Sequence, residues 1–176
     1  MAQLWKRPYA ATVLSLVLLA GLIVCYVSSI ISSSGTALAT TGLNFASTLL
    51  GPTRFEEIDV KTHTDAHKVS IKTKGPSDVY IVTNRVTPGG HSGWHTHPGP
   101  SVVSVKSGTA TVYESDDPNC TPHFYPAGTG FVDAGGGHAH LVRNEGNVEL
   151  ETVAFQVLPA GAARRIDTPN PGTCPF

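Results

Sequence analysis

The sequence predicts an all-β domain, built as a sandwich or a barrel, from about residue 53 onward. Short stretches of apolar and β-branched residues recur at regular spacing, separated by clusters of Gly, Pro, Asn and Asp. No stretch after residue 53 shows the apolar period of an amphipathic helix. Two His-x-His pairs stand beside glycine-rich segments in the same part of the chain. We therefore expect a cup of short strands with histidine side chains inside it.

The first 39 residues are predicted to be a targeting segment that takes no part in the fold. Lys6 and Arg7 precede an uncharged, mostly aliphatic run at residues 10–31, which we expect to be helical. The sequence Ala37-Leu38-Ala39 fits a cleavage site, whereas a run of this length suffices to span about 30 Å of hydrocarbon. Signal peptide and transmembrane anchor therefore both stay open. Either one predicts export, to the cell surface or as a secreted protein.

The remaining elements follow in chain order. Residues 40–52 are small and apolar without a clear period, which indicates a linker or a short helix. The barrel is expected over residues 53–160, and residues 161–176 are expected to form a C-terminal tail. Strands are predicted at residues 53–59, 67–72, 78–86, 101–106, 109–114, 124–126, 138–143 and 148–158. In the strand at 101–106, alternation predicts that Ser101, Val103 and Val105 face the interior.

Two histidine pairs are the candidate functional residues. His95 and His97 are two residues apart, so in an extended strand both imidazoles point to the same side. A third ligand is expected downstream, where a glycine run leads into His138 and His140. Neutral imidazoles that meet in one cavity bind divalent transition metals, and three of them leave coordination positions open for a substrate.

The cysteines indicate one disulfide. Cys25 lies in the hydrophobic run, which leaves Cys120 and Cys174 as an even pair in a domain expected to be exported. Their bond would tie the loop around residues 116–119 back to the C-terminal tail and contribute roughly 2–4 kcal/mol. Two unrelated free thiols are the alternative.

These residues resemble the two sequence motifs of the cupin superfamily, in the form found in small single-domain cupins. Five residues keep the spacing of the first motif: Gly89, His95, His97, Ser101 and Gly108. The family usually has glutamate where this chain has Ser101. The second motif is looser and is matched by Gly137, His140 and Asn144, with Gly135 at its usual proline and Thr129 at its leading glycine. The resemblance covers about residues 53–160.

The resemblance implies a cupin-type β-barrel, a double-stranded jelly roll, preceded here by the N-terminal hydrophobic helix. It favours His140 over His138 as the third ligand, because Gly137 and Asn144 keep the family spacing around His140. His138 is then a candidate fourth ligand, and His91 a candidate for the mouth of the site. Oxygenase, isomerase and decarboxylase activities are all found in the superfamily, three-histidine cupin sites resemble those of thiol dioxygenases, and a homodimer is plausible.

Ser101 would remove the negatively charged ligand of the family. A serine hydroxyl can at most hold a water on the metal, so we expect three neutral histidines and no protein charge at the site. Such a centre should retain Fe, Ni, Cu or Zn better than Mn and should favour a small anionic ligand. Because imidazole binds metal only when neutral, the metal affinity is expected to fall as the pH drops through about 6.5.

The charge composition makes nucleic acid a poor partner. The chain has a net charge of −1, or about −3 without its first 39 residues, and shows no basic stripe. Membrane contact is expected only through the N-terminal segment, and His63, His67 and His123 are expected to be solvated. No catalytic residue can be named, since Glu149 and Glu151 are only distant candidates for a general base. An enzyme, a non-catalytic ligand binder and a structural metal barrel therefore stay open.

Overall fold

The structure, a computed structural model, describes residues 38–176. The predicted N-terminal helix and Cys25 lie outside the described residues. All regular structure from residue 38 onward is β, and this part holds no helix long and apolar enough to cross a membrane.

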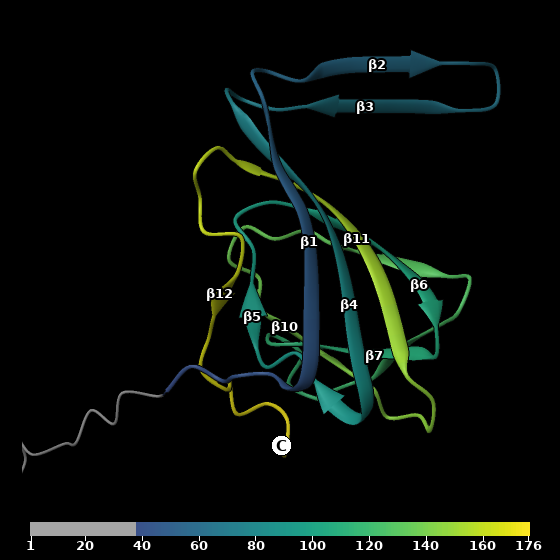
Figure 1. Cartoon of the computed structure of the whole chain (residues 1–176), viewed down its shortest axis with the longest axis vertical. Helices are drawn as coiled ribbons and strands as arrows, with labels where there is room; N and C mark the ends of the chain where they lie inside the picture. The colour runs from purple at the N-terminus through teal and green to yellow at the C-terminus, as the bar shows by residue number, and fades with distance from the viewer. Residues whose placement is uncertain (1–37) are drawn as a thin grey trace, which may run out of the picture. The chain divides into compact units, whose positions relative to one another are not determined.

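Ten strands form one antiparallel sheet that rolls into a nearly closed barrel, and two more form a separate hairpin (Figure 1). The strands are β1 (Leu43–Phe55), β2 (Asp59–His63), β3 (Lys68–Lys72), β4 (Ser77–His91), β5 (His95–Thr96), β6 (Ser101–Ser107), β7 (Thr109–Glu114), β8 (His123–Pro126), β9 (Gly130–Asp133), β10 (His140–Arg143), β11 (Leu150–Pro159) and β12 (Ile166–Asp167).

The barrel has two faces of five strands each. One face has the order β1-β4-β11-β6-β9, and the other has the order β12-β5-β10-β7-β8. The faces join where Arg143 of β10 pairs with His91 of β4. Strands that are neighbours in space but distant in sequence are typical of a jelly roll. The expected all-β barrel of the jelly-roll type is therefore confirmed.

The interior is built by strict alternation along the strands. In β6 the side chains of Ser101, Val103 and Val105 are buried while their neighbours at 102, 104 and 106 are exposed, as the sequence predicted. Val105 packs with Val86 and Leu150 in one apolar cluster of the barrel. Burying each such aliphatic side chain contributes roughly 1.5–3 kcal/mol. The same alternation brings Ser101 into the interior at the end of β6.

The expectation of a linker or short helix at residues 40–52 is wrong. Strand β1 runs through this segment and pairs with β4 from Leu43 opposite His91 to Phe55 opposite Ser77. Almost every residue of β1 is exposed, so burial imposes no apolar alternation on its sequence. The register also shifts between Leu50 and Thr53, which breaks what period there is. The short strands β2, β9 and β12 were likewise not predicted.

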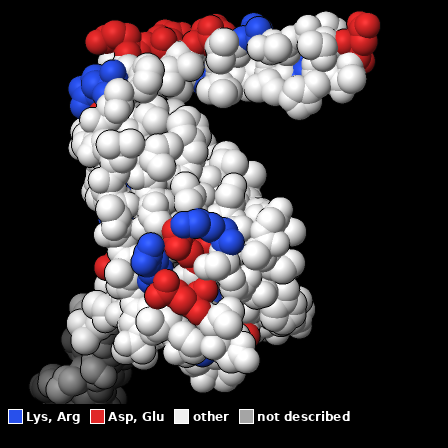
Figure 2. Space-filling view, turned by 45° about the vertical axis from the view of Figure 1, so that its right-hand side comes forward, with Lys and Arg blue, Asp and Glu red and all other residues white. Residues whose placement is uncertain are grey.

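The hairpin of β2 and β3 projects beyond one end of the barrel (Figure 1). All ten of its strand residues are exposed. In the face shown in Figure 2, charged side chains of both signs gather on this hairpin and in one mixed cluster on the barrel, and most of the remaining surface is uncharged.

The predicted disulfide joins Cys120 to Cys174. Cys174 is buried against Trp94, Tyr113 and Leu141, so the bond fastens the C-terminal tail to a second apolar cluster of the barrel. This attachment matters for the site described next, because residues of the tail form part of its wall.

Candidate metal centre

Three histidine rings converge inside the barrel. His95, His97 and His140 are each about 5% exposed, and one ring nitrogen from each lies within 4.8 Å of the others. The ring centroids are 4.9 Å apart for His95 and His97 and 4.3 Å apart for His95 and His140. These are the three residues singled out by the motif spacing.

Strand pairing and backbone hydrogen bonds hold these rings in place. His140 of β10 lies directly opposite His95 of β5. The Nδ1 atom of His95 donates to the carbonyl oxygen of Gly93 at 2.9 Å, and that of His97 donates to the carbonyl oxygen of Arg164 at 2.7 Å. Because Nδ1 carries the proton in both rings, Nε2 is left as a bare lone pair. Fixing the tautomer through the second nitrogen is how metal-binding histidines are usually oriented.

The electrostatics of the barrel keep the three imidazoles neutral. Burial lowers the pKa of His95 well below 6.5, and the nearby His140 and Arg165 lower it further. Burial also lowers the pKa of His97, and it lowers the pKa of His140 to about 4. Neutral imidazole is the form that binds a metal, so these rings are ready ligands at neutral pH.

A buried carboxylate that was not predicted from the sequence lies beside the histidines. Asp133 of β9 is 8% exposed, with Oδ2 3.9 Å from His97 Nε2 and Oδ1 3.7 Å from His140 Nδ1. Neither separation is short enough for a hydrogen bond. The expectation of a site without protein charge is therefore wrong. The carboxylate enters the interior because β9 pairs with β6 and places Asp133 opposite Ser101.

This donor set fits a divalent transition metal. Three imidazoles suit Fe, Ni, Cu and Zn, and a carboxylate adds a hard, anionic donor. Two buried atoms of the group, His140 Nδ1 and Asp133 Oδ2, have no hydrogen-bond partner among the described residues. Buried polar atoms are rarely left unpaired, and a cation bound within the group would satisfy the carboxylate oxygen.

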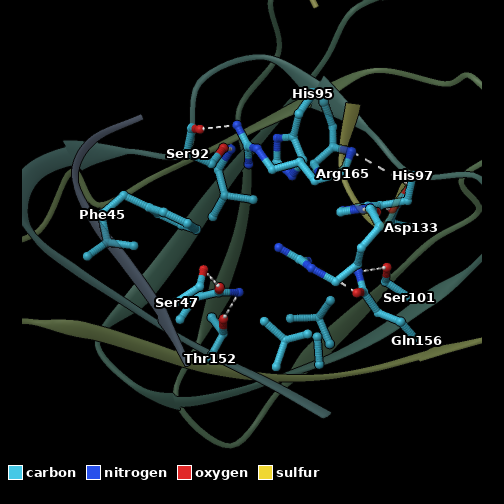
Figure 3. Close-up of a pocket in the computed structure, with 18 of the residues that line it drawn as sticks. Phe45, Ser47, Ser92, His95, His97, Ser101, Asp133, Thr152, Gln156 and Arg165 are labelled. Atoms are coloured by element: carbon cyan, nitrogen blue, oxygen red, sulfur yellow. Dashed lines mark hydrogen bonds and ion pairs between the residues drawn. The ribbon is translucent and has the colours of Figure 1, made fainter. Parts of the chain in front are cut away.

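The open cavity beside the histidines leaves about 570 Å³ free of protein atoms, and part of this space is solvent at its mouth. Figure 3 shows side chains from β1, β5, β6, β9 and β11 and from the C-terminal tail arranged around this space, with His95 and His97 at one end and Thr152 at the other. Ser101 lines it, as expected, and its hydroxyl accepts a hydrogen bond of 2.8 Å from Gln156 Nε2. Aliphatic side chains and Phe131 supply the apolar part of the wall.

Two arginines from the C-terminal tail, Arg164 and Arg165, complete the wall, and neither was predicted from the sequence. Arg165 is already paired: Nε contacts Asp167 at 2.5 Å and Nη2 donates to the carbonyl of Ser92 at 2.6 Å. Arg164 donates only to the neutral Gln156 side chain, at 3.2 Å, and has no carboxylate within 4 Å among residues 38–176. Arg164 is therefore a half-buried positive charge without a counter-ion.

His138 and His91 do not join the cluster. His138 precedes β10, and its ring contacts Glu114 at 3.3 Å and Asp116 at 3.0 Å outside the cavity. It was expected to share a face with His140, but the strand begins only at residue 140, so the alternation does not extend back to it. His91 accepts a hydrogen bond from the Gly93 amide and does not line the cavity. His138 therefore does not lie where a fourth ligand would, and His91 does not line the mouth of the cavity.

Asn144 of the second motif has a structural role, and the two candidate general bases, Glu149 and Glu151, lie away from the cavity. The Asn144 amide donates to the carbonyls of Val86 and Val148 at 2.8 Å each, and so locks the turn after β10. Glu151 pairs with Lys106 and Arg85 away from the cavity, and Glu149 is exposed, so neither is placed as a general base for this site.

The lowered pKa values shift the expected pH dependence of metal binding. A histidine whose pKa is depressed stays neutral below pH 6.5, so protons compete with the metal only at lower pH. We expect metal to be retained well below pH 6.5 and lost as the pH approaches about 4, where His140 is protonated. Metal content after dialysis at a series of pH values measures this. Half-loss at pH 6.5 or above would contradict it.

Comparisons with known proteins find only remote similarity. No protein-family model matches the chain, and no match is found among curated proteins. Among solved structures, the chain is similar to a conserved protein with a double-stranded β-helix domain from Klebsiella pneumoniae, at 21% identity and a TM-score of 0.44, over 68% of this chain and 85% of that one.

A predicted oxalate decarboxylase from Thermotoga maritima is 22% identical, with a TM-score of 0.38, over 49% of this chain and 84% of that one. A salicylate 1,2-dioxygenase from Pseudoaminobacter salicylatoxidans, solved in complex with gentisate, is 17% identical with a TM-score of 0.38, over 44% of this chain and 20% of that one. These similarities are remote. The strand order and register therefore define the fold, and the positions of the three histidines define the site.

Proposed function

We propose that this chain is an exported barrel that holds a divalent transition-metal ion on His95, His97 and His140 and takes up a small anionic molecule beside it. The observation that carries the proposal is the meeting of three buried, neutral imidazoles whose ligand atoms lie within 4.8 Å of one another. A bound ion would supply a Lewis-acid centre with coordination positions left open. The donor set favours Fe, Ni, Cu or Zn.

The charge of the cavity wall supports an anionic ligand. Arg164 lines the cavity and has no carboxylate partner among the described residues. A half-buried guanidinium without a counter-ion favours a carboxylate or a similar oxyanion, to which it donates charge-assisted hydrogen bonds. Gln156 and Ser101 add neutral polar groups on the same wall, while Val82, Val103 and Phe131 add apolar surface. Together they suit a small organic acid.

Replacing Arg164 by glutamine is expected to weaken the binding of a small carboxylate by about 10- to 100-fold, since a hydrogen bond to a charged group contributes about 1.5–3 kcal/mol. Isothermal titration of the metal-loaded protein with malonate, and with uncharged malonamide as the neutral match, measures the effect. Arg85→Gln is the control, because Arg85 pairs with Glu151 away from the cavity. Equal affinities for malonate and malonamide in the unmodified protein would contradict the anionic ligand.

Among its three possible roles, the geometry supports ligand binding best. A metal that only stabilised the fold would not need an open cavity with an unpaired cation in its wall. Among the described lining residues, the carboxylate of Asp133 is the one acidic group near the histidines. A reaction that needs a proton acceptor would have to use it or the ligand itself. Binding without turnover places no such demand on the site.

Export is supported by the disulfide. Cys120 and Cys174 are bonded, and such structural disulfides form and persist in oxidising compartments outside the cytosol. The hydrophobic run at residues 10–31 with its preceding positive charges supports the same destination. We propose that the barrel faces the outside, either anchored by that run or released from it.

Elemental analysis of the protein, purified without a histidine tag, tests the proposed function. We expect about one equivalent of a transition metal per chain, because one set of three imidazoles is present in the described barrel. Protein that stays free of metal after incubation with excess Fe, Ni, Cu and Zn salts would refute it.

A further inference from the structure

We propose that Asp133 supplies, from the neighbouring strand, the anionic metal ligand that position 101 lacks. This inference rests on the proposed metal centre and identifies a fourth protein ligand within it. The carboxylate of Asp133 would then balance part of the metal's charge, although position 101 is a serine. This carboxylate comes from β9, the strand next to β6.

The strand register allows a carboxylate at position 133 to take the place of one at position 101. Ser101 of β6 and Asp133 of β9 are direct partners in an antiparallel pair. The Cβ atoms of such partners are about 4.5–5.5 Å apart, and their side chains point to the same face. Both side chains are buried and line the cavity, and Figure 3 shows them on the same side of it as His97. A carboxylate carried by either position can reach the same space.

The two oxygens of Asp133 differ in their surroundings. Oδ1 accepts a hydrogen bond of 2.9 Å from the Gly135 amide, which holds the carboxylate in place. Oδ2 is buried and has no hydrogen-bond partner among the described residues. No Lys or Arg of the described chain lies within 4 Å of either oxygen. A buried carboxylate oxygen without a donor is costly, so a cation bound at this oxygen would be stabilised.

The unpaired oxygen of Asp133 faces a second hydrogen-bond acceptor, the Nε2 atom of His97. His97 donates through Nδ1 to Arg164, so its Nε2 carries no proton, and Asp133 Oδ2 lies 3.9 Å from it. Two acceptors that face each other without a proton between them repel, and a shared cation removes that repulsion. The 3.9 Å separation is shorter than the 4.8 Å that bounds the ligand atoms of the three histidines. Asp133 thus lies next to His97 and His140, although the set of ligand atoms that all lie within 4.8 Å of one another holds the three histidines alone.

A second departure from the motif agrees with this role. Gly135 stands where the family usually has proline, and its φ is +65°, a value that proline cannot adopt. Proline would also lack the amide hydrogen that Gly135 donates to Asp133. The serine at 101 and the glycine at 135 therefore have one common explanation. Ser101 brings no carboxylate to the usual ligand position, and Gly135 holds the carboxylate of Asp133, which takes its place.

The alternative is that Asp133 only orients His140, whose Nδ1 lies 3.7 Å from Oδ1. Loss of an orienting partner weakens the binding of every metal by a similar factor, typically 10- to 100-fold. Loss of a carboxylate ligand instead penalises a hard ion such as Mn²⁺ far more than Zn²⁺, which imidazoles bind well on their own. The ratio of the two affinities therefore separates a ligand from a positioning residue.

The experiment measures Mn²⁺ and Zn²⁺ affinities of the full chain and of its Asp133→Asn variant. We expect the variant to lose more than about 100-fold in Mn²⁺ affinity and about 10-fold or less in Zn²⁺ affinity. Adding Ser101→Glu to Asp133→Asn should restore most of the Mn²⁺ affinity, because the carboxylate returns to the same space from the partner strand. Asp116→Asn, at an exposed aspartate that contacts His138, is the control and should change neither affinity.

Equal losses for the two metals, no loss, or failure of the double variant to regain Mn²⁺ would each overturn the role of Asp133. Circular dichroism of each variant excludes loss of the fold as the cause. Failure of the unmodified protein to bind either metal would instead refute the metal centre itself, so the two failures are distinguishable.

Discussion

Single replacement of His95, His97 or His140 by alanine is expected to remove most of the bound metal while the barrel stays folded. Each ring offers one of three imidazole donors that lie within 4.8 Å of one another. None of the three belongs to the apolar clusters that build the core, so the strand pairing should survive their truncation. A variant that no longer binds metal should also lose the contribution of metal binding to the free energy of unfolding. This contribution is about 2.7 kcal/mol when the free metal concentration is 100 times the dissociation constant.

Metal content by elemental analysis and the thermal unfolding midpoint, each measured with and without added metal, check this result. His123→Ala is the matched control, because His123 lies exposed on β8 and does not line the cavity. A His95, His97 or His140 variant that kept its full metal content and its metal-dependent rise in midpoint would count against histidine ligation.

Removing the disulfide by replacing both Cys120 and Cys174 with serine is expected to cost about 2–5 kcal/mol in the free energy of unfolding. The bond closes a loop with a sequence separation of 54 residues, and Cys174 is buried against Trp94, Tyr113 and Leu141. Loosening the tail should reach the metal centre too, because the carbonyl of Arg164 holds the ring of His97. We therefore expect weaker metal binding as well as lower stability.

Urea unfolding of the double-serine variant and of the unmodified protein measures the cost. For a domain of this size, the corresponding drop in the thermal midpoint is roughly 5–15 °C. Reduction of the unmodified protein with a thiol should reproduce the drop, whereas the double variant should not respond to the thiol. An unchanged midpoint in the variant would show that the tail is held by other contacts.

The sequence predicted the parts of the fold that burial forces into a pattern. In β6, with one face toward the core, alternation correctly placed Ser101, Val103 and Val105 inside. The His-x-His spacing brought His95 and His97 into the same cavity, although the regular strand there spans only His95–Thr96. Convergence with His140 followed from the family spacing, which encodes a pairing between strands that local periodicity does not reveal.

What the sequence did not predict depends on contacts between distant segments. Asp133 reaches the site because the four-residue strand β9 pairs with β6, and so short a run carries too few residues to show a period. Arg164 lies in the tail beyond the predicted barrel, and it reaches the cavity wall because the tail folds back. Strand β1 gave no pattern at residues 40–52, since all of its residues except Phe45 are exposed and burial therefore requires an apolar side chain at that one position only.

The most direct test of the metal centre is a crystal structure of the metal-loaded protein with anomalous diffraction data collected at the absorption edge of the bound metal. We predict one strong anomalous peak in the barrel, in contact with Nε2 of His95 and His97 and with a ring nitrogen of His140. Absence of a peak there, or a peak bound only by surface residues such as His138 and Asp116, would contradict the proposed centre.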